Sequence, residues 1–207
     1  MKLFLSSFGI QPNLGQEFLR LVGKPAKDIR FAYITNAADP YPPEKRGWMD
    51  DVMKMFTDLK LSPETIDLKD YHEGKTLKAK LSQYDVIWCG GGNTWYLRYV
   101  MKTSSFDQII KDLVEDGKVY GGDSAGAIIM GPTLKYVDMI DEPEDSPERI
   151  EQGLGIVKFV IVPHWGTEKY LKELAAMRDG LANDGYDVKA LTDKQAVVVN
   201  GSEVKVL

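Results

Sequence analysis

Residues 118–131 read K-V-Y-G-G-D-S-A-G-A-I-I-M-G, which predicts a short apolar strand, a tight glycine turn and the start of a helix. The segment from Gly122 to Gly126 fits G-x-S-x-G, the pattern of a nucleophile elbow with Ser124 at its apex. Small residues on both sides of the serine let the strand and the helix approach closely. The N–H groups and positive dipole end of the helix could then stabilise an oxyanion. The stretch predicts an α/β fold with Ser124 as the candidate nucleophile; an ordinary glycine turn is the alternative.

Predicted strands and helices alternate along most of the chain. Strands are predicted, in addition to the one before Ser124, at residues 2–7, 30–35, 64–68, 84–89 and 157–162. Helices are predicted at residues 14–22, 48–59, 78–82, 95–101, 104–115 and 168–183. Three short β segments follow at 187–191, 196–199 and 203–207, with Asn200-Gly201 as a hairpin turn between the last two. This order predicts one α/β domain over residues 1–207, with a mostly parallel sheet, helices on both faces and a C-terminal β-hairpin.

Composition excludes several classes of protein. The chain has a net charge of −5, and its lysines and arginines form no cluster that would offset this charge locally. Both facts argue against nucleic acid as a partner. The one cysteine, Cys89, excludes an internal disulfide framework and a multi-cysteine metal site, as is typical of a reducing cytoplasm. No run approaches the roughly 18 apolar residues of a membrane span. The apolar start of the chain is too short for a signal peptide, so we expect a cytoplasmic protein without a membrane partner.

The chain has only two histidines, and one of them follows a predicted buried strand. His164 comes after the apolar run 159–163, which places it at the edge of the sheet where Ser124 lies. We interpret His164 as the general base for the serine, with a hydrogen-bonded structural histidine as the alternative. His72 lies in a polar turn and is expected on the surface.

An acid should orient the imidazole, and the chain offers many. Asp193 lies between two late strands, and a crowded acidic segment follows the elbow helix: Asp138, Asp141, Glu142, Glu144, Asp145, Glu148 and Glu151. Most of this segment is expected to be a solvated flap. No calcium-loop spacing occurs in it, and we expect neither a metal nor a cofactor.

A second glycine turn, residues 90–92, follows the strand predicted just before the elbow strand. Both turns should therefore face one crevice. The turn could bind phosphate at a helix start. It lacks the motifs of dinucleotide and P-loop sites, so we favour an oxyanion hole made by one of its N–H groups and that of Ala125. Cys89, just before the turn, is expected to be a buried strand-end residue.

Three motifs together resemble the peptidase E (aspartyl dipeptidase) and cyanophycinase family of serine peptidases. They are C-G-G-G-N-T at 89–94, G-D-S-A-G-A at 122–127 followed by G-P-T at 131–133, and V-P-H-W at 162–165. The resemblance implies a fold like that of class I glutamine amidotransferases, a flavodoxin-like architecture with serine in place of cysteine at the elbow. It implies Ser124 as nucleophile, His164 as base, and an oxyanion hole from Gly92 and Ala125.

The resemblance implies two positions for the third catalytic residue. They correspond to Asp138, which we rank first, and to Asp193. Gly91 and Asn93, on either side of Gly92, are candidates for contacting the substrate. The chain departs from the family after His164, because the arginine-containing segment that resembles G-E-T-R in aspartyl dipeptidases is missing. Arg178, in the later predicted helix, has no clear match.

The expected function is therefore that of a cytoplasmic serine peptidase, monomeric or homodimeric, which hydrolyses short peptides through an acyl-enzyme on Ser124. Dipeptides with an N-terminal aspartate are candidate substrates. An esterase or amidase on the same scaffold is one alternative, and a catalytically weak relative that binds a small molecule or a partner is another. A nucleotide-binding protein is the most distant alternative.

Overall fold

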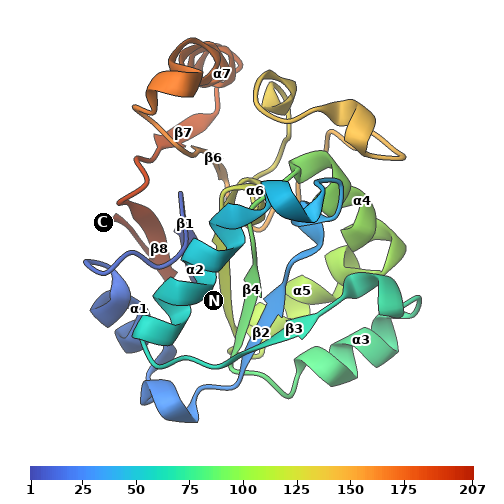
Figure 1. The fold of residues 1–207 in the computed structure, drawn as a ribbon, viewed down its shortest axis with the longest axis vertical. Helices are drawn as coiled ribbons and strands as arrows, with labels where there is room; N and C mark the ends of the chain where they lie inside the picture. The colour runs from blue at the N-terminus through green and yellow to red at the C-terminus, as the bar shows by residue number, and fades with distance from the viewer.

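The computed structural model describes residues 1–207 and contains a seven-stranded sheet and a separate pair of strands (Figure 1). The strands of the large sheet lie in the order β3-β2-β4-β5-β1-β8-β9. Their bounds are β1 Lys2–Ser6, β2 Phe31–Ile34, β3 Pro63–Ile66, β4 Val86–Cys89, β5 Val119–Asp123, β8 Ala196–Asn200 and β9 Glu203–Val206. The first five strands are parallel, whereas β8 is antiparallel to both β1 and β9. The predicted parallel sheet and C-terminal hairpin are confirmed.

Seven α-helices and seven short 3-10 helices connect or cover the strands. The α-helices are α1 Gly15–Val22, α2 Gly47–Asp58, α3 Gly74–Leu81, α4 Thr94–Thr103, α5 Phe106–Glu115, α6 Ala125–Ile128 and α7 Leu171–Asn183. The 3-10 helices are η1 Ala26–Asp28, η2 Asn36–Ala38, η3 Pro43–Lys45, η4 Leu68–Asp70, η5 Val137–Met139, η6 Pro143–Asp145 and η7 Glu168–Tyr170. None of the helices combines the length and the apolar character that crossing a bilayer requires.

The large sheet separates two hydrophobic clusters, because successive side chains along a strand point to opposite faces. On β2, Phe31 and Tyr33 pack into the cluster under α1 and α2, while Ala32 and Ile34 pack into the larger cluster under α3 to α7. Helices therefore cover both faces of the sheet, as the sequence predicts (Figure 1).

One part of the predicted sheet is wrong. The strand after the acidic segment, β6 Phe159–Val162, pairs in parallel with β7 Asp187–Ala190 and forms a two-stranded sheet of its own. The edge of β1 that β6 could have extended is occupied by the antiparallel strand β8. His164 therefore reaches the elbow from a second sheet, on which α7 packs, and not from the strand edge that carries Ser124.

Candidate active site

Ser124 lies between β5 and α6 with backbone angles of φ 48° and ψ −112°. Positive φ is strained for a residue with a side chain, and it turns the serine out of the strand. The turn holds because the flanking glycines allow close backbone contact. A Cβ on Gly126 would lie 2.0 Å from the Cys89 carbonyl oxygen, and one on Gly122 would lie 2.4 Å from the Gly126 carbonyl oxygen. The predicted strand–serine–helix geometry is present.

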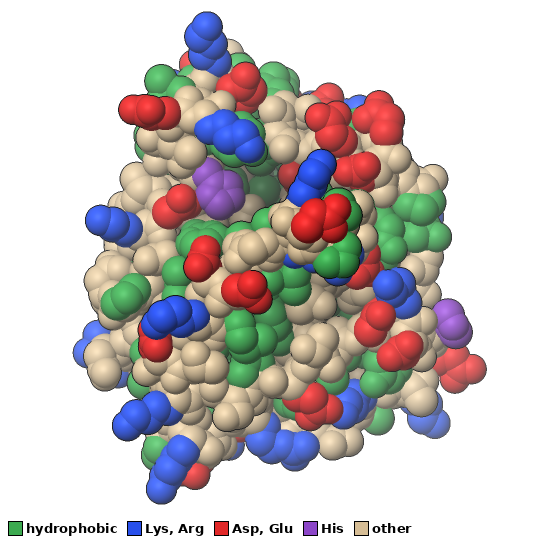
Figure 2. Space-filling model, viewed as in Figure 1, with side chains coloured by type: hydrophobic (Ala, Val, Ile, Leu, Met, Phe, Trp, Pro, Cys, Tyr) green, Lys and Arg blue, Asp and Glu red, His purple; other side chains and the backbone are tan.

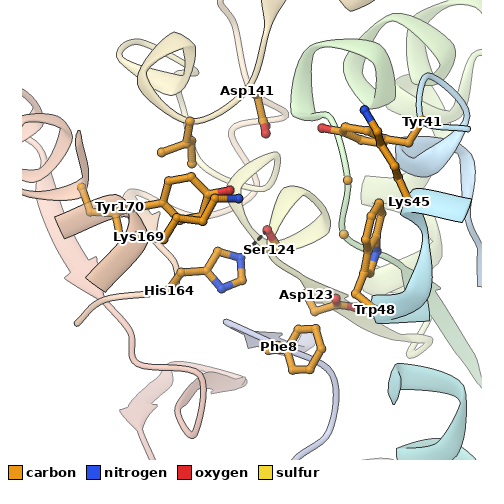
Figure 3. Close-up of a pocket in the computed structure, with 14 residues that line it drawn as sticks. Phe8, Tyr41, Lys45, Trp48, Asp123, Ser124, Asp141, His164, Lys169 and Tyr170 are labelled. Atoms are coloured by element: carbon orange, nitrogen blue, oxygen red, sulfur yellow. Dashed lines mark hydrogen bonds between the residues drawn. The ribbon is translucent and has the colours of Figure 1, made fainter. Parts of the chain in front are cut away.

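The imidazole of His164 bridges Ser124 and Asp193. Nε2 lies 3.0 Å from Ser124 Oγ, and Nδ1 lies 2.7 Å from Asp193 Oδ1 (Figure 3 shows the first contact). Because an ionised carboxylate only accepts hydrogen bonds, Nδ1 donates to Asp193, which leaves Nε2 free to accept the serine proton. The hydrogen bond from His164 lowers the pKa of Asp193 below its usual range, against the opposing effect of burial. The three side chains form a continuous Ser–His–Asp chain.

Ser7, which the sequence analysis did not single out, ties this chain to the large sheet. Its hydroxyl donates to Asp193 Oδ1 at 2.8 Å and accepts from the backbone N–H of His164 at 2.7 Å. Ser7 follows β1 and Asp193 precedes the antiparallel neighbour β8, so both lie at the same edge of the sheet. A polar residue directly after a central parallel strand was the signal that could have pointed to Ser7.

Asp138 is not the acid that the structure brings to the histidine. It belongs to η5, its side chain is 42% exposed, and its carboxylate lies 3.4 Å from the guanidinium of Arg149. The ranking of Asp138 before Asp193 is therefore corrected. Asp193 contacts His164, whereas Asp138 forms a surface ion pair. The β7–β8 connection carries Asp193 to the imidazole, and the acid of the acidic segment that lines the cavity beside His164 is Asp141, not Asp138.

The second glycine turn follows β4, and Gly91 and Gly92 line the same cavity as Ser124. Gly92 has φ 141°, and a Cβ there would lie 2.2 Å from the carbonyl oxygen of Ala37. Its N–H donates to no group of the protein. Ala125 is the first residue of α6, where an N–H has no carbonyl one turn earlier to bond. Both predicted oxyanion-hole residues therefore flank the serine.

Asn93, expected to contact substrate, does not line the cavity. Its buried side chain caps α4, where Oδ1 accepts from the N–H of Tyr96 at 2.9 Å. Its Nδ2 donates to the carbonyl oxygen of Glu142 at 2.8 Å. Asn93 thus fastens the acidic segment to the start of α4, and of the two predicted substrate contacts only Gly91 lies at the cavity surface.

The cavity above Ser124 has a volume of about 450 Å³. Tyr41, Lys45 and Trp48 form one wall, and Lys169 and Tyr170 form the opposite wall (Figure 3). Leu174 also lines the cavity. Seen from outside, it is a hollow beside one of the two histidines, with hydrophobic side chains inside and basic side chains at its rim (Figure 2). Neither Lys45 nor Lys169 pairs with a carboxylate. Trp48 belongs to α2 and Leu174 to α7, whereas the other wall residues lie in loops or short 3-10 helices. No motif in the sequence distinguishes any of them.

Two further carboxylates line the cavity, and burial raises the pKa of each to about 6. Asp123 accepts a 2.6 Å hydrogen bond from the indole N–H of Trp88. This bond and hydrogen bonds from the backbone of Gly91 and Gly9 lower its pKa, but burial outweighs them. Asp141 accepts two hydrogen bonds from Thr94. Both acids are thus held by neutral donors at the cavity surface.

The remaining candidates lie away from the cavity. Cys89 is fully buried, and burial raises the pKa of its thiol to about 12. His72 is exposed. Arg178 covers the ring of Trp165 at 4.7 Å and pairs with Asp179, so its guanidinium is committed outside the cavity. No group of three or more His, Cys, Asp and Glu side chains is arranged to hold a metal ion.

Comparison with known proteins identifies relatives along the whole chain. The family model described as Peptidase family S51 matches residues 3–207. An uncharacterized peptidase of Pasteurella multocida is 27% identical over 165 residues, which cover 79% of this chain and 78% of the relative. Peptidase E of Streptomyces coelicolor is 32% identical over 105 residues, covering 51% and 42%. The crystal structure of a candidate Peptidase E protein from Listeria monocytogenes superposes with a TM-score of 0.85 at 22% identity, over 100% of this chain and 97% of the other.

Proposed function

The chain belongs to peptidase family S51 and is a serine-type peptidase, and from this premise we propose that it hydrolyses short peptides through an acyl-enzyme on Ser124. The observation that carries the proposal is the hydrogen-bonded chain from Ser124 through His164 to Asp193, with contacts of 3.0 and 2.7 Å. Each contact is within the reach that proton transfer requires.

In the acylation step, Ser124 Oγ attacks the carbonyl carbon of the scissile peptide bond while His164 Nε2 takes the hydroxyl proton. The carbonyl oxygen becomes an oxyanion, which the N–H groups of Gly92 and Ala125 stabilise. His164 then gives its proton to the departing amine, and the acyl group stays on Ser124. Asp193 stabilises the charged imidazole throughout and holds the tautomer that the step requires.

In the deacylation step, a water molecule gives a proton to His164 Nε2 and attacks the acyl carbon. The second oxyanion collapses, the bond to Ser124 Oγ breaks, and the proton returns from His164 to the serine. Ser7 assists both steps indirectly, because its hydroxyl holds the backbone of His164 and the carboxylate of Asp193 together. Because Ser7 fixes His164 relative to Asp193, Nε2 of the imidazole stays within reach of the Ser124 hydroxyl proton.

The size and charge of the cavity favour short peptides. About 450 Å³ lies within the range of small-molecule sites. The unpaired ammonium groups of Lys45 and Lys169 could bind a substrate carboxylate, either a C-terminus or an acidic side chain such as that of an N-terminal aspartate. These lysines would take the part that an arginine plays in aspartyl dipeptidases.

The test compares wild type with Ser124→Ala on a panel of dipeptides, tripeptides and esters. We expect the variant to lose hydrolysis and labelling by a fluorophosphonate while keeping its circular dichroism spectrum. Ser202→Ala, at an exposed turn, is the matched control and should behave as wild type. Unchanged turnover by Ser124→Ala would refute the proposal. Hydrolysis of esters without peptides would favour an esterase, and absence of both hydrolysis and labelling in wild type would favour a binding protein.

A further inference from the structure

A second cavity lies along α7, beside the turn that carries His164. Its volume is about 300 Å³, at the lower end of the range of small-molecule sites, so it suits a single side chain better than a whole peptide. We call it the Trp165 pocket. Residues of the turn and of one face of α7, spaced three and four apart, line it: Trp165, Gly166, Leu171, Leu174, Ala175 and Arg178.

The Trp165 pocket offers apolar surface to a ligand. Leu171 is 56% exposed, which makes it the most exposed large hydrophobic residue of the chain. The guanidinium of Arg178 lies 4.7 Å from the centre of the Trp165 ring and pairs with Asp179. The one charge at the pocket is thus already compensated, and the remaining lining is apolar or glycine. A concave site of this kind favours an apolar group.

The turn that carries the catalytic base also forms part of the Trp165 pocket. The N–H of Trp165 donates to the carbonyl oxygen of Leu191 at 2.9 Å, and the N–H of Thr167 donates to that of His164 at 3.0 Å. These bonds fix the turn, which presents the imidazole to the catalytic cavity and the indole to the pocket. Leu174, only 1% exposed, lines both cavities, so the two adjoin at this side chain.

The chemistry of acylation decides which part of a substrate lies nearest to the Trp165 pocket. His164 gives its proton to the departing amine, so the leaving residue begins within hydrogen-bond distance of Nε2, while the acyl part is held at Ser124. His164 lies on the same side of the catalytic cavity as Lys169 and Tyr170 (Figure 3). This side is built from the residues that follow His164 in the chain, and Leu174 is among them.

We propose that the Trp165 pocket binds the side chain of the leaving residue and selects peptides in which that side chain is large and apolar, such as leucine, methionine or phenylalanine. This inference rests on the proposed function of Ser124. Alanine or glycine at the same position leaves the apolar surface of the pocket exposed to water, and the free energy of burying it is lost.

Three dipeptides test the inference: Ala-Leu, Ala-Ala and Leu-Ala. Steady-state kinetics of wild type give kcat/KM, and calorimetry with the Ser124→Ala protein gives Kd without turnover. We expect kcat/KM to be about 10- to 100-fold higher for Ala-Leu than for Ala-Ala, as the added apolar carbons allow, and Kd to be lower in the same direction. Leu-Ala, which places leucine on the acyl side, should show no such gain. An equal gain with Leu-Ala would overturn the assignment to the leaving residue.

Filling the pocket should remove the preference. In Ala175→Leu the new side chain occupies the space of the leaving side chain, so kcat/KM for Ala-Leu should fall to about that for Ala-Ala. Ala176→Leu is the matched control, because it makes the same change at the next, exposed residue of α7 outside both cavities. It should keep the preference of wild type. Leu171→Ala removes an exposed apolar wall, should reduce the preference severalfold, and provides a second test if Ala175→Leu fails to fold.

A preference for Ala-Leu that survives both Ala175→Leu and Leu171→Ala overturns the inference. The result is separable from the proposed function. If wild type hydrolyses no peptide but the Ser124→Ala protein binds Ala-Leu more tightly than Ala-Ala, and Ala175→Leu removes the difference, the pocket assignment stands and the peptidase mechanism falls. If wild type hydrolyses Ala-Leu and Ala-Ala equally well, the mechanism stands and the pocket assignment falls.

Discussion

At the residue level, the two acids available to His164 differ in what holds them. Asp193 contacts the imidazole at 2.7 Å, whereas Asp138 is engaged with Arg149 at the surface. We expect Asp193→Asn to lower kcat by about 10²- to 10⁴-fold, because the amide can hold the wrong imidazole tautomer and cannot stabilise the imidazolium. Asp138→Asn removes only an exposed ion pair, so kcat should change by less than about twofold. Steady-state kinetics on one dipeptide measure both; a larger loss in Asp138→Asn would reverse the assignment.

The buried carboxylate of Asp123 predicts a pH dependence of stability. Burial raises its pKa to about 6, so the folded state binds the proton more tightly than the unfolded state does. The free energy of unfolding should therefore fall as pH rises from about 4 to about 6, by up to about 3 kcal/mol, and be flat above that range. Asp123→Asn removes this contribution and keeps an acceptor for Trp88.

Urea unfolding of wild type and Asp123→Asn between pH 4 and pH 7 measures this effect. The stability of wild type relative to the variant should decrease across the interval, whereas the contribution of Asp141, which has the same sign, remains in both proteins. A constant difference between the two proteins, or one that grows with pH, is incompatible with a raised pKa at Asp123.

Local sequence pattern could predict Ser124 and His164 but not the acid that completes their chain. A serine between small residues and a histidine after an apolar run each have a local pattern. Asp193 has none, because its place beside His164 follows from the antiparallel pairing of β8 with β1, a contact between the two ends of the chain. Asp141 was recognisable as one of several acids, but which of them lines the cavity depends on the fixing of Thr94 and Asn93 to the acidic segment.

At the level of elements, the β5–α6 turn depends on the absence of side chains. We expect Gly126→Ala to lower the free energy of unfolding by about 3 kcal/mol or more, because the new methyl group would lie 2.0 Å from the backbone oxygen of Cys89, which cannot move without displacing β4. Gly47→Ala, at the first residue of α2 with open space around it, should be neutral or stabilising by up to about 1 kcal/mol. Thermal unfolding of the two variants makes the comparison, and equal behaviour would contradict the packing geometry.

The order of strands and helices was predictable because most buried strands have a continuous apolar run and each long helix has an apolar face. Strand partners were not predictable to the same extent. The run at residues 157–162 resembles those of the large sheet, yet β6 pairs only with β7. An apolar run indicates that a strand is buried, but it does not specify the strand's partner. The side chains of β6 are buried against α6 and α7, as they would also be in the large sheet.

For the whole molecule, the indole of Trp88 connects the core to the site. On one side its ring contacts the aromatic cluster of Phe4, Phe18, Phe31 and Phe56 beneath α1 and α2. On the other side its N–H donates to Asp123, the residue before Ser124. Gly121 makes room for the ring, since a Cβ there would lie 2.0 Å from an indole carbon. The same side chain thus fills the core and supports the floor of the cavity.

Two substitutions in this cluster separate stability from activity. Trp88→Phe keeps an aromatic ring and deletes the N–H, so it should cost about 1–3 kcal/mol of unfolding free energy and lower kcat severalfold, because Asp123 loses its 2.6 Å partner next to Ser124. Phe18→Leu, in the same cluster but without a bond to the site, should cost about 1–2 kcal/mol and leave kcat unchanged. Urea unfolding and steady-state kinetics at a temperature where both variants are folded test the pair. Since the loss of stability is similar, an equal loss of kcat in both variants would show that the core acts on the site through general loosening and not through the Trp88–Asp123 bond.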